Sequence, residues 1–164
     1  MRAGPVHPLA VALAERLGER HLTLAVAESC TGGLVATMIT DQPGSSAYFR
    51  GGVVSYADEA KQHLLEVPAA LLSAHGAVSS EVAAAMAVGV RKQLQTDLGA
   101  SVTGIAGPGA EGTRKPVGLT YVGVASPGRT RVLEHRFAGD RWAVRQAAAE
   151  ALLELLLQEM GEMA

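Results

Sequence analysis

Three side chains in the first half of the chain have types and a spacing suited to hydrolytic chemistry. The segment GSSAYFRGGVVSYADEAK, residues 44–61, contains Ser46, Tyr56 and Lys61. A serine hydroxyl is a weak nucleophile until a neighbouring base takes its proton, and a lysine whose pKa is lowered by burial can be that base. A tyrosine hydroxyl can pass the proton between them. The same residues are also compatible with a polar loop, a half-buried tyrosine and a solvated helical lysine.

A second polar segment, AESCTGG at residues 27–33, follows a predicted strand and precedes a predicted helix. Free N–H groups at such a junction attract anions, and the hydroxyls of Ser29 and Thr31 can add to the site. Ordinary helix capping is an equally good interpretation. Cys30 has no histidine near it in the sequence, which favours a packed thiol over a thiolate nucleophile.

The loop GPGAEG, residues 107–112, has the G-x-G-x-x-G spacing of a dinucleotide site, but it leads into a strand rather than a helix. The lysine of a phosphate-binding P-loop is also missing from its required position. These two nucleotide-site interpretations are therefore rejected. What remains is either a wall of backbone amides or a surface loop that needs glycine for its turns, and the residues concerned are Thr103, Gly104, Gly107 and Gly109.

Composition narrows the class of protein. The chain has 164 residues, a net charge of -2, a single cysteine and no basic cluster. We therefore expect one compact cytoplasmic domain, residues 1–164, with no disulfide, no nucleic-acid partner and no membrane segment. The histidine spacings match no metal site, so neither a metal nor a cofactor is predicted.

The elements that must position these residues follow from periodicity and turn chemistry. Apolar residues at helical spacing predict helices at 8–17, 34–40, 58–67, 68–76, 81–99 and 140–160. Strand-like runs occupy 22–29, 47–57, 100–107, 119–126 and 130–137. Helices and strands alternate before two neighbouring strands appear, which predicts an α/β fold: a three-layer α/β/α sandwich with a mixed sheet. Arg141 and Arg145 share a face near the start of the last helix, where they either bind a phosphate or are solvated.

Five segments occur in an order that closely resembles the CinA C-terminal domain family. They are AESCTGG, PGSSAYFRGGVVSYADEAK, HGAVSSEVAAAMA, VTGIAGPGAEGTRKPVG and GDRWAVRQAA, and the resemblance runs from about residue 9 to 157. It implies hydrolysis of the carboxamide of nicotinamide mononucleotide to nicotinate mononucleotide and ammonia, a step of pyridine nucleotide salvage. Many family members carry an additional N-terminal domain, so we expect activities of that domain, such as ADP-ribose cleavage, to be absent here.

The resemblance also implies roles for individual residues. It makes Ser46 the nucleophile, with Tyr56 and Lys61 as its partners. Residues of the segments that line the family's cleft are expected to bind the nucleotide, with an arginine at its phosphate: Ser29, Thr31, Gly32, Thr103, Gly104, Arg141 and Arg145. The alternative is a catalytically silent nucleotide-binding or regulatory protein. We expect a homodimer, because the apolar first and last helices can supply a partner surface.

Overall fold

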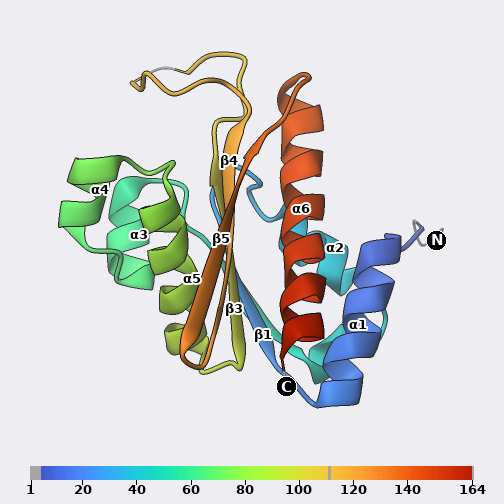
Figure 1. Cartoon of the computed structure of the whole chain (residues 1–164). Helices are drawn as coiled ribbons and strands as arrows, with labels where there is room; N and C mark the ends of the chain where they lie inside the picture. Colours follow the sequence, from blue (N-terminus) through green and yellow to red (C-terminus); the bar gives the residue numbers. More distant parts are fainter. Residues whose placement is uncertain (1–4, 111, 164) are drawn as a thin grey trace.

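Five strands form a single sheet between two layers of helices (Figure 1). The computed structural model describes residues 5–110 and 112–163, so Glu111 of the loop singled out in the sequence lies outside the described residues. The elements are α1 (Pro8–Arg20), β1 (Leu24–Glu28), α2 (Leu34–Thr40), the 3-10 turn η1 (Ser45–Ala47), β2 (Phe49–Val54), α3 (Asp58–Leu65), α4 (Ala69–His75), α5 (Ser80–Leu94), β3 (Leu98–Gly104), β4 (Leu119–Ser126), β5 (Arg129–Arg136) and α6 (Arg141–Glu162). The predicted α/β/α sandwich with a mixed sheet is confirmed.

The strand order is β2-β1-β3-β4-β5. β1 pairs in parallel with both β2 and β3, whereas β4 runs antiparallel to β3 and to β5. In the register of the first pair, Leu24 lies opposite Phe49 and Glu28 lies opposite Val54. The carboxyl ends of β1, β2 and β3 therefore meet at one edge of the sheet, where open α/β sheets place their ligand sites.

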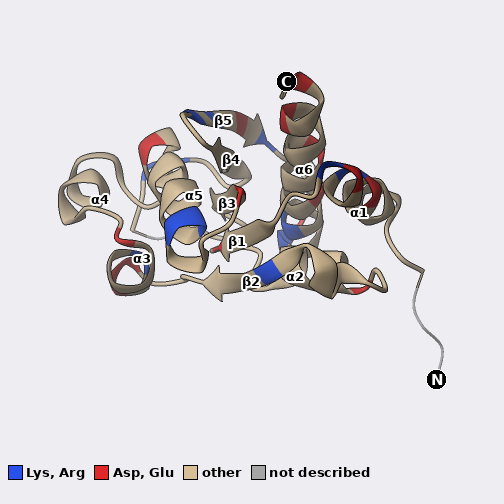
Figure 2. Cartoon of the chain, turned by 90° about the horizontal axis from the view of Figure 1, so that it is seen from below, with Lys and Arg blue, Asp and Glu red and all other residues tan. Residues whose placement is uncertain are grey.

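Alternation of side chains along the strands gives the sheet two apolar faces. In β1, Leu24 and Val26 join a core with α1, α2 and α6, while Ala25 and Ala27 join a core with α3, α4 and α5. Charged residues lie on α1, α3, α5, α6 and β5, whereas α2, α4 and β3 carry none (Figure 2). Among the described residues, no helix combines the length and the apolar character that crossing a bilayer requires.

The predicted helix at 81–99 is five residues too long. α5 ends at Leu94, Gln95 takes a left-handed conformation with φ 52°, and β3 begins at Leu98. Gly99 therefore lies in β3 and not in the predicted helix. A Cβ there would lie 2.2 Å from the carbonyl oxygen of Ala87, so the glycine allows α5 to pack closely against β3.

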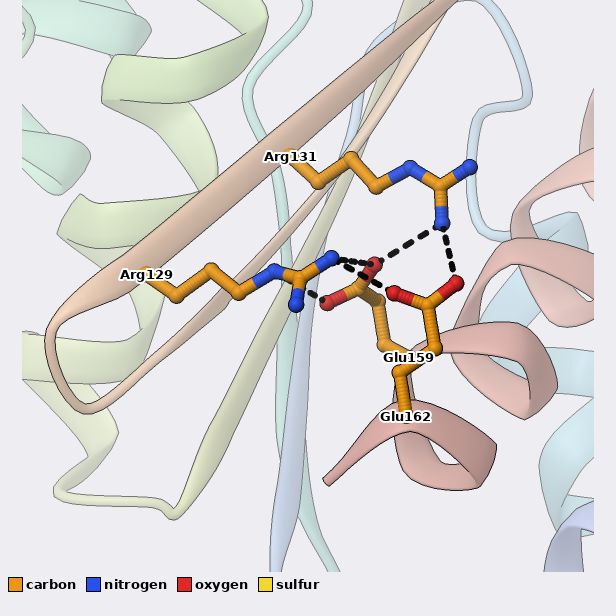
Figure 3. Close-up of polar contacts among 4 residues, drawn as sticks. All are labelled: Arg129, Arg131, Glu159 and Glu162. Atoms are coloured by element: carbon orange, nitrogen blue, oxygen red, sulfur yellow. Dashed lines mark hydrogen bonds and ion pairs between the residues drawn. The ribbon is translucent and has the colours of Figure 1, made fainter. Parts of the chain in front are cut away.

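A buried carboxylate ties the end of α6 to the edge strand β5 (Figure 3). Glu159 is 2% exposed and accepts from Arg129 Nε at 3.2 Å and from Arg131 Nη1 at 3.1 Å. Glu162 contacts the same two arginines, but its side chain is half exposed. The two glutamates share their partners and differ in burial, which makes them a matched pair for mutagenesis.

We expect Glu159→Gln to lower the free energy of unfolding by about 1–3 kcal/mol, because it removes the charge that the two arginines neutralise at a desolvated position. Glu162→Gln should cost less, since water already screens its ion pairs. Urea denaturation of both variants at pH 7 measures the difference. Equal losses in the two variants would show that the burial of Glu159 contributes nothing.

Candidate functional site

The turn after β1 is fixed at its start by Glu28. The buried carboxylate of Glu28 accepts from the backbone N–H of Val35 at 2.8 Å and of Ala36 at 3.1 Å, two donors in the first turn of α2 that have no partner within the helix. Its carbonyl oxygen accepts from the backbone N–H of Ser55 at 2.8 Å, beyond the end of β2. Glu28 thus joins β1, α2 and the β2–α3 connection at the point where Ser29 begins the turn.

Lys61 lies on α3 and points toward that turn. Its side chain is 1% exposed, and Nζ lies 3.1 Å from Ser29 Oγ, 2.7 Å from the Ser55 carbonyl oxygen and 3.1 Å from the Tyr56 carbonyl oxygen. Burial lowers the pKa of Lys61, while Asp58 and then Cys30 oppose that effect. Burial therefore moves Lys61 toward the neutral amine that a general base requires.

The three neighbours of Lys61 Nζ can all accept a hydrogen bond. As an ammonium, Lys61 donates to Ser29 Oγ and to the carbonyl oxygens of Ser55 and Tyr56, which occupies its three N–H donors. As a neutral amine, it keeps two N–H donors for the carbonyls, and its lone pair is left for the Ser29 hydroxyl. In that neutral form Ser29 donates to Lys61, which is the direction of proton transfer that activates a serine.

The structure does not bring Ser46 to Tyr56 and Lys61, so the predicted arrangement of the trio is wrong. Ser46 lies in η1 before β2, and Tyr56 follows the other end of that strand. A six-residue strand spans roughly 17 Å, and β2 runs straight beside β1 instead of folding back as a hairpin. Ser46 is thus at the amino ends of the parallel strands and Lys61 at their carboxyl ends.

A cavity of about 590 Å³ opens beside the carboxyl ends of the strands. Its wall comes from the β2–α3 connection, the end of α4, the loop between β3 and β4, and the start of α6. The charged groups among its described lining residues are Asp58, Lys115 and Arg141. Gly104 at the end of β3 and Gly107 and Gly109 of the loop also line it. Of the four residues considered for a backbone-rich wall, the three glycines line the cavity and Thr103 does not.

Tyr56 links the lysine to this cavity. Its carbonyl oxygen accepts from Lys61, while its half-exposed side chain lines the cavity and its hydroxyl accepts from Arg141 Nη2 at 3.1 Å. Arg141 also donates to the Gly107 carbonyl oxygen at 2.7 Å. In the part of the chain that the structure describes, Arg141 is the side-chain partner of the Tyr56 hydroxyl, so the expected proton relay through that hydroxyl has no contact to support it.

Arg145 forms hydrogen bonds to the turn after β1 and is not among the described residues that line the cavity. It donates to the carbonyl oxygens of Cys30 at 3.0 Å and Thr31 at 2.9 Å, and its guanidinium lies 5.7 Å from the ring centre of Trp142. Gly32 adopts φ 59° beneath this guanidinium, and a Cβ at Gly32 would lie 3.5 Å from Arg145 Nη2. Of the two arginines predicted to meet a phosphate, the structure brings only Arg141 to the described cavity wall.

The remaining predicted ligand residues have structural partners or lie inside the fold. Thr103 donates to the Ala77 carbonyl oxygen at 2.9 Å, and Thr31 is fully buried. Gly104 lines the cavity, and a Cβ there would lie 2.6 Å from Thr120 Oγ1. Burial raises the pKa of the Cys30 thiol to about 11, which agrees with the expectation that this cysteine is no nucleophile.

Two features of the candidate site were not found by sequence reasoning. Ser29 was predicted to bind substrate, yet it is the hydroxyl partner of Lys61, 32 residues away in the chain. Lys115, which lines the cavity, was not selected at all. Glu28 is a charged residue at the end of an apolar strand. Its position was a sequence signal that the turn carrying Ser29 is held by hydrogen bonds.

Curated relatives and solved structures resemble this chain along most of its length. A CinA-like protein of Geobacter sulfurreducens is 51% identical over 91% of this chain and 36% of its own length, and one of Thermosynechococcus vestitus is 51% identical over 93% of this chain and 37% of its own. The chain thus spans little more than a third of these relatives. The competence damage-inducible protein A of Klebsiella pneumoniae is 32% identical, with a TM-score of 0.94 over 98% of this chain and all of that one.

A structure from Agrobacterium tumefaciens, the competence/damage inducible protein CihA, has a TM-score of 0.87 at 34% identity over 97% of this chain and 99% of that one. The family model of the CinA C-terminal domain matches residues 6–160. Sequence, fold and relatives thus agree, and this chain belongs to the CinA C-terminal domain family.

Proposed function

We propose that this chain hydrolyses the carboxamide of nicotinamide mononucleotide, with Ser29 as nucleophile and Lys61 as general base. The observation that carries the proposal is the buried Lys61 Nζ, which lies 3.1 Å from Ser29 Oγ with both of its other neighbours being carbonyl oxygens. A hydroxyl and a lysine with a lowered pKa at this distance can perform acyl transfer without a histidine.

In the first step, Lys61 accepts the Ser29 proton as Oγ attacks the carbon of the amide. The charge that develops on the amide oxygen needs hydrogen-bond donors already in place. Among the described residues, the backbone N–H of Thr31 forms no hydrogen bond to a backbone acceptor, and Thr31 belongs to the turn that carries Ser29. The backbone N–H of Cys30 is directed toward its own thiol. We assign the oxyanion to the Thr31 N–H.

In the second step, the protonated Lys61 gives its proton to the departing nitrogen, and ammonia leaves. Water then attacks the acyl-serine while Lys61 accepts its proton, the bond between the acyl carbon and Ser29 Oγ breaks, and Lys61 returns the proton to Oγ as nicotinate mononucleotide is released. Tyr56 supports both steps through its carbonyl oxygen, which orients Lys61, and its side chain lines the adjoining cavity.

The cavity supports a nucleotide-sized substrate. Its volume of about 590 Å³ lies within the roughly 300–1,000 Å³ of small-molecule sites, and its wall combines glycine backbone with the cation Arg141. Arg141 has five N–H donors and uses two of its nitrogens on Gly107 and Tyr56. Donors therefore remain for an anionic group of the ligand.

Release of ammonia and formation of the acid mononucleotide by the purified chain tests this function. Turnover of nicotinamide mononucleotide that is lost in Ser29→Ala would support both the reaction and the nucleophile. A folded chain that shows no turnover would reject the proposal.

The second candidate is a protein that binds the nucleotide without turnover and acts in regulation. It is favoured by the names of the solved relatives, which refer to competence and damage induction rather than to a reaction. Calorimetric binding of the mononucleotide by the unaltered chain, with no ammonia released over hours, would establish this alternative.

A further inference from the structure

A second cation faces the cavity that Arg141 lines. Lys115 comes from the loop between β3 and β4, and it contributes to the cavity wall together with Gly76 and Arg141. Neither the activation of Ser29 nor the oxyanion contact involves this lysine. The cavity therefore contains a positive group whose role is unassigned.

The ammonium of Lys115 has a donor to spare. Its Nζ donates to the carbonyl oxygen of His75 at 2.6 Å and to that of Val78. An ammonium has three N–H donors, so these contacts hold the side chain in place and leave one donor for another acceptor. Within residues 5–110 and 112–163, no carboxylate forms an ion pair with either Lys115 or Arg141.

The charge balance of the wall favours an anion. The described lining contains the two cations Lys115 and Arg141 and one carboxylate, that of Asp58. Glu81 also experiences the charge of Lys115, but its side chain is 43% exposed and it lies outside the described lining. A phosphate is the anion that a lysine and an arginine bind together, the arginine through its fork of donors and the lysine as a point charge.

We propose that Lys115 and Arg141 form one anion subsite that holds the phosphate of the substrate and makes the chain select a mononucleotide over the corresponding riboside. The substrate part of this inference rests on the proposed function. The subsite itself is defined by the two cations, and any sugar phosphate of suitable size can probe it.

Ribose 5-phosphate and ribose are the direct probes, because neither contains the amide. We expect calorimetry to show binding of ribose 5-phosphate that weakens as salt is added, with ribose bound at least tenfold more weakly. Lys115→Met should weaken binding of the phosphate by roughly 10- to 100-fold and leave ribose unchanged. Arg114→Met is the matched control, because Arg114 is exposed on the same loop and lies outside the described lining.

The corresponding kinetic test compares the mononucleotide with the riboside. Lys115→Met should raise the KM for the mononucleotide by roughly 10- to 100-fold with little change in kcat, and it should leave the riboside unaffected. Lys115→Gln removes the charge but keeps N–H donors for the His75 and Val78 carbonyls, so it separates charge from anchoring of the loop. Because the two cations share one phosphate, the effects of Lys115→Met and Arg141→Met should not add.

The outcomes separate this proposal from the proposed function. Loss of ribose 5-phosphate binding in Lys115→Met, without turnover by the unaltered chain, would keep the subsite and reject the amidase. Suppose that the unaltered chain turns over normally and that Lys115→Met raises the KM for the mononucleotide and for the riboside by the same factor. That result would keep the amidase and overturn the subsite. Equal weakening by Lys115→Met and Arg114→Met would also overturn it, since the effect would then be general charge on the loop.

Discussion

Replacing Ser29 by alanine is expected to lower kcat for the amide by roughly 10⁴-fold or more, because no other hydroxyl contacts Lys61 in the described part of the chain. Ser46→Ala should change kcat by less than about twofold, since Ser46 lies beyond the opposite end of β2. Ammonia release under saturating substrate, measured for both variants beside the unaltered chain, makes the comparison.

Two controls must show that a loss of activity in Ser29→Ala is not caused by unfolding or by loss of substrate binding. Circular dichroism and the thermal midpoint must show that Ser29→Ala is folded, and the variant should still bind the substrate because the cavity wall is untouched. A large loss in Ser46→Ala combined with activity in Ser29→Ala would return the nucleophile to its sequence-predicted position and remove Ser29 from the mechanism.

Lys61→Met should lower kcat by roughly 10²- to 10⁴-fold, which is the range for loss of a general base. The unaltered chain should show kcat/KM rising with pH until Lys61 is neutral, with the midpoint below the ordinary lysine pKa, because burial lowers that pKa. The rising limb should be missing from the residual activity of Lys61→Met. An unchanged pH profile in the variant would assign the limb to another group.

The same lowered pKa predicts a pH-dependent stability. In the unfolded chain Lys61 keeps its proton up to its ordinary pKa, whereas in the folded chain it loses the proton at lower pH. Between these two pKa values the unfolded state binds more protons, so the free energy of unfolding contributed by Lys61 rises with pH. Urea denaturation at several pH values above 7 should show this rise in the unaltered chain and a smaller one in Lys61→Met.

The fold was largely predictable from the sequence because its signals are local. Asp140 caps α6, and Ser79 accepts from the Val82 N–H at the start of α5, so both helices begin where capping residues indicate. The end of α5 was not predicted, because the helical pattern was extended to Gly99, whereas that glycine lies in β3 and allows α5 to pack closely against the strand. Its role depends on packing that the sequence does not display.

The site was predictable in part. Lys61 and Tyr56 were selected correctly as neighbours, because only four residues separate them and the intervening helix begins at Asp58. Ser29 and Lys61 are adjacent only because β1 and β2 pair in parallel, which places residues about thirty positions apart at one edge of the sheet. Sequence reasoning chose Ser46 from the residue types of the segment 44–61 and from the family resemblance, whereas the parallel pairing of β1 and β2 decides which serine lies close to Lys61 in space.

The proposed reacting groups and the proposed ligand-binding groups come from different parts of the chain. Ser29 is placed by β1 and by the contacts of Glu28, whereas Lys115, Gly107 and Gly109 of the cavity wall belong to the loop between β3 and β4. Bond-breaking groups and ligand-selecting groups are therefore encoded by separate stretches of the chain. Exchanging residues 107–117 for other loops is accordingly a route to new substrates that leaves the reaction centre intact, and it suits a library in which only one short segment varies.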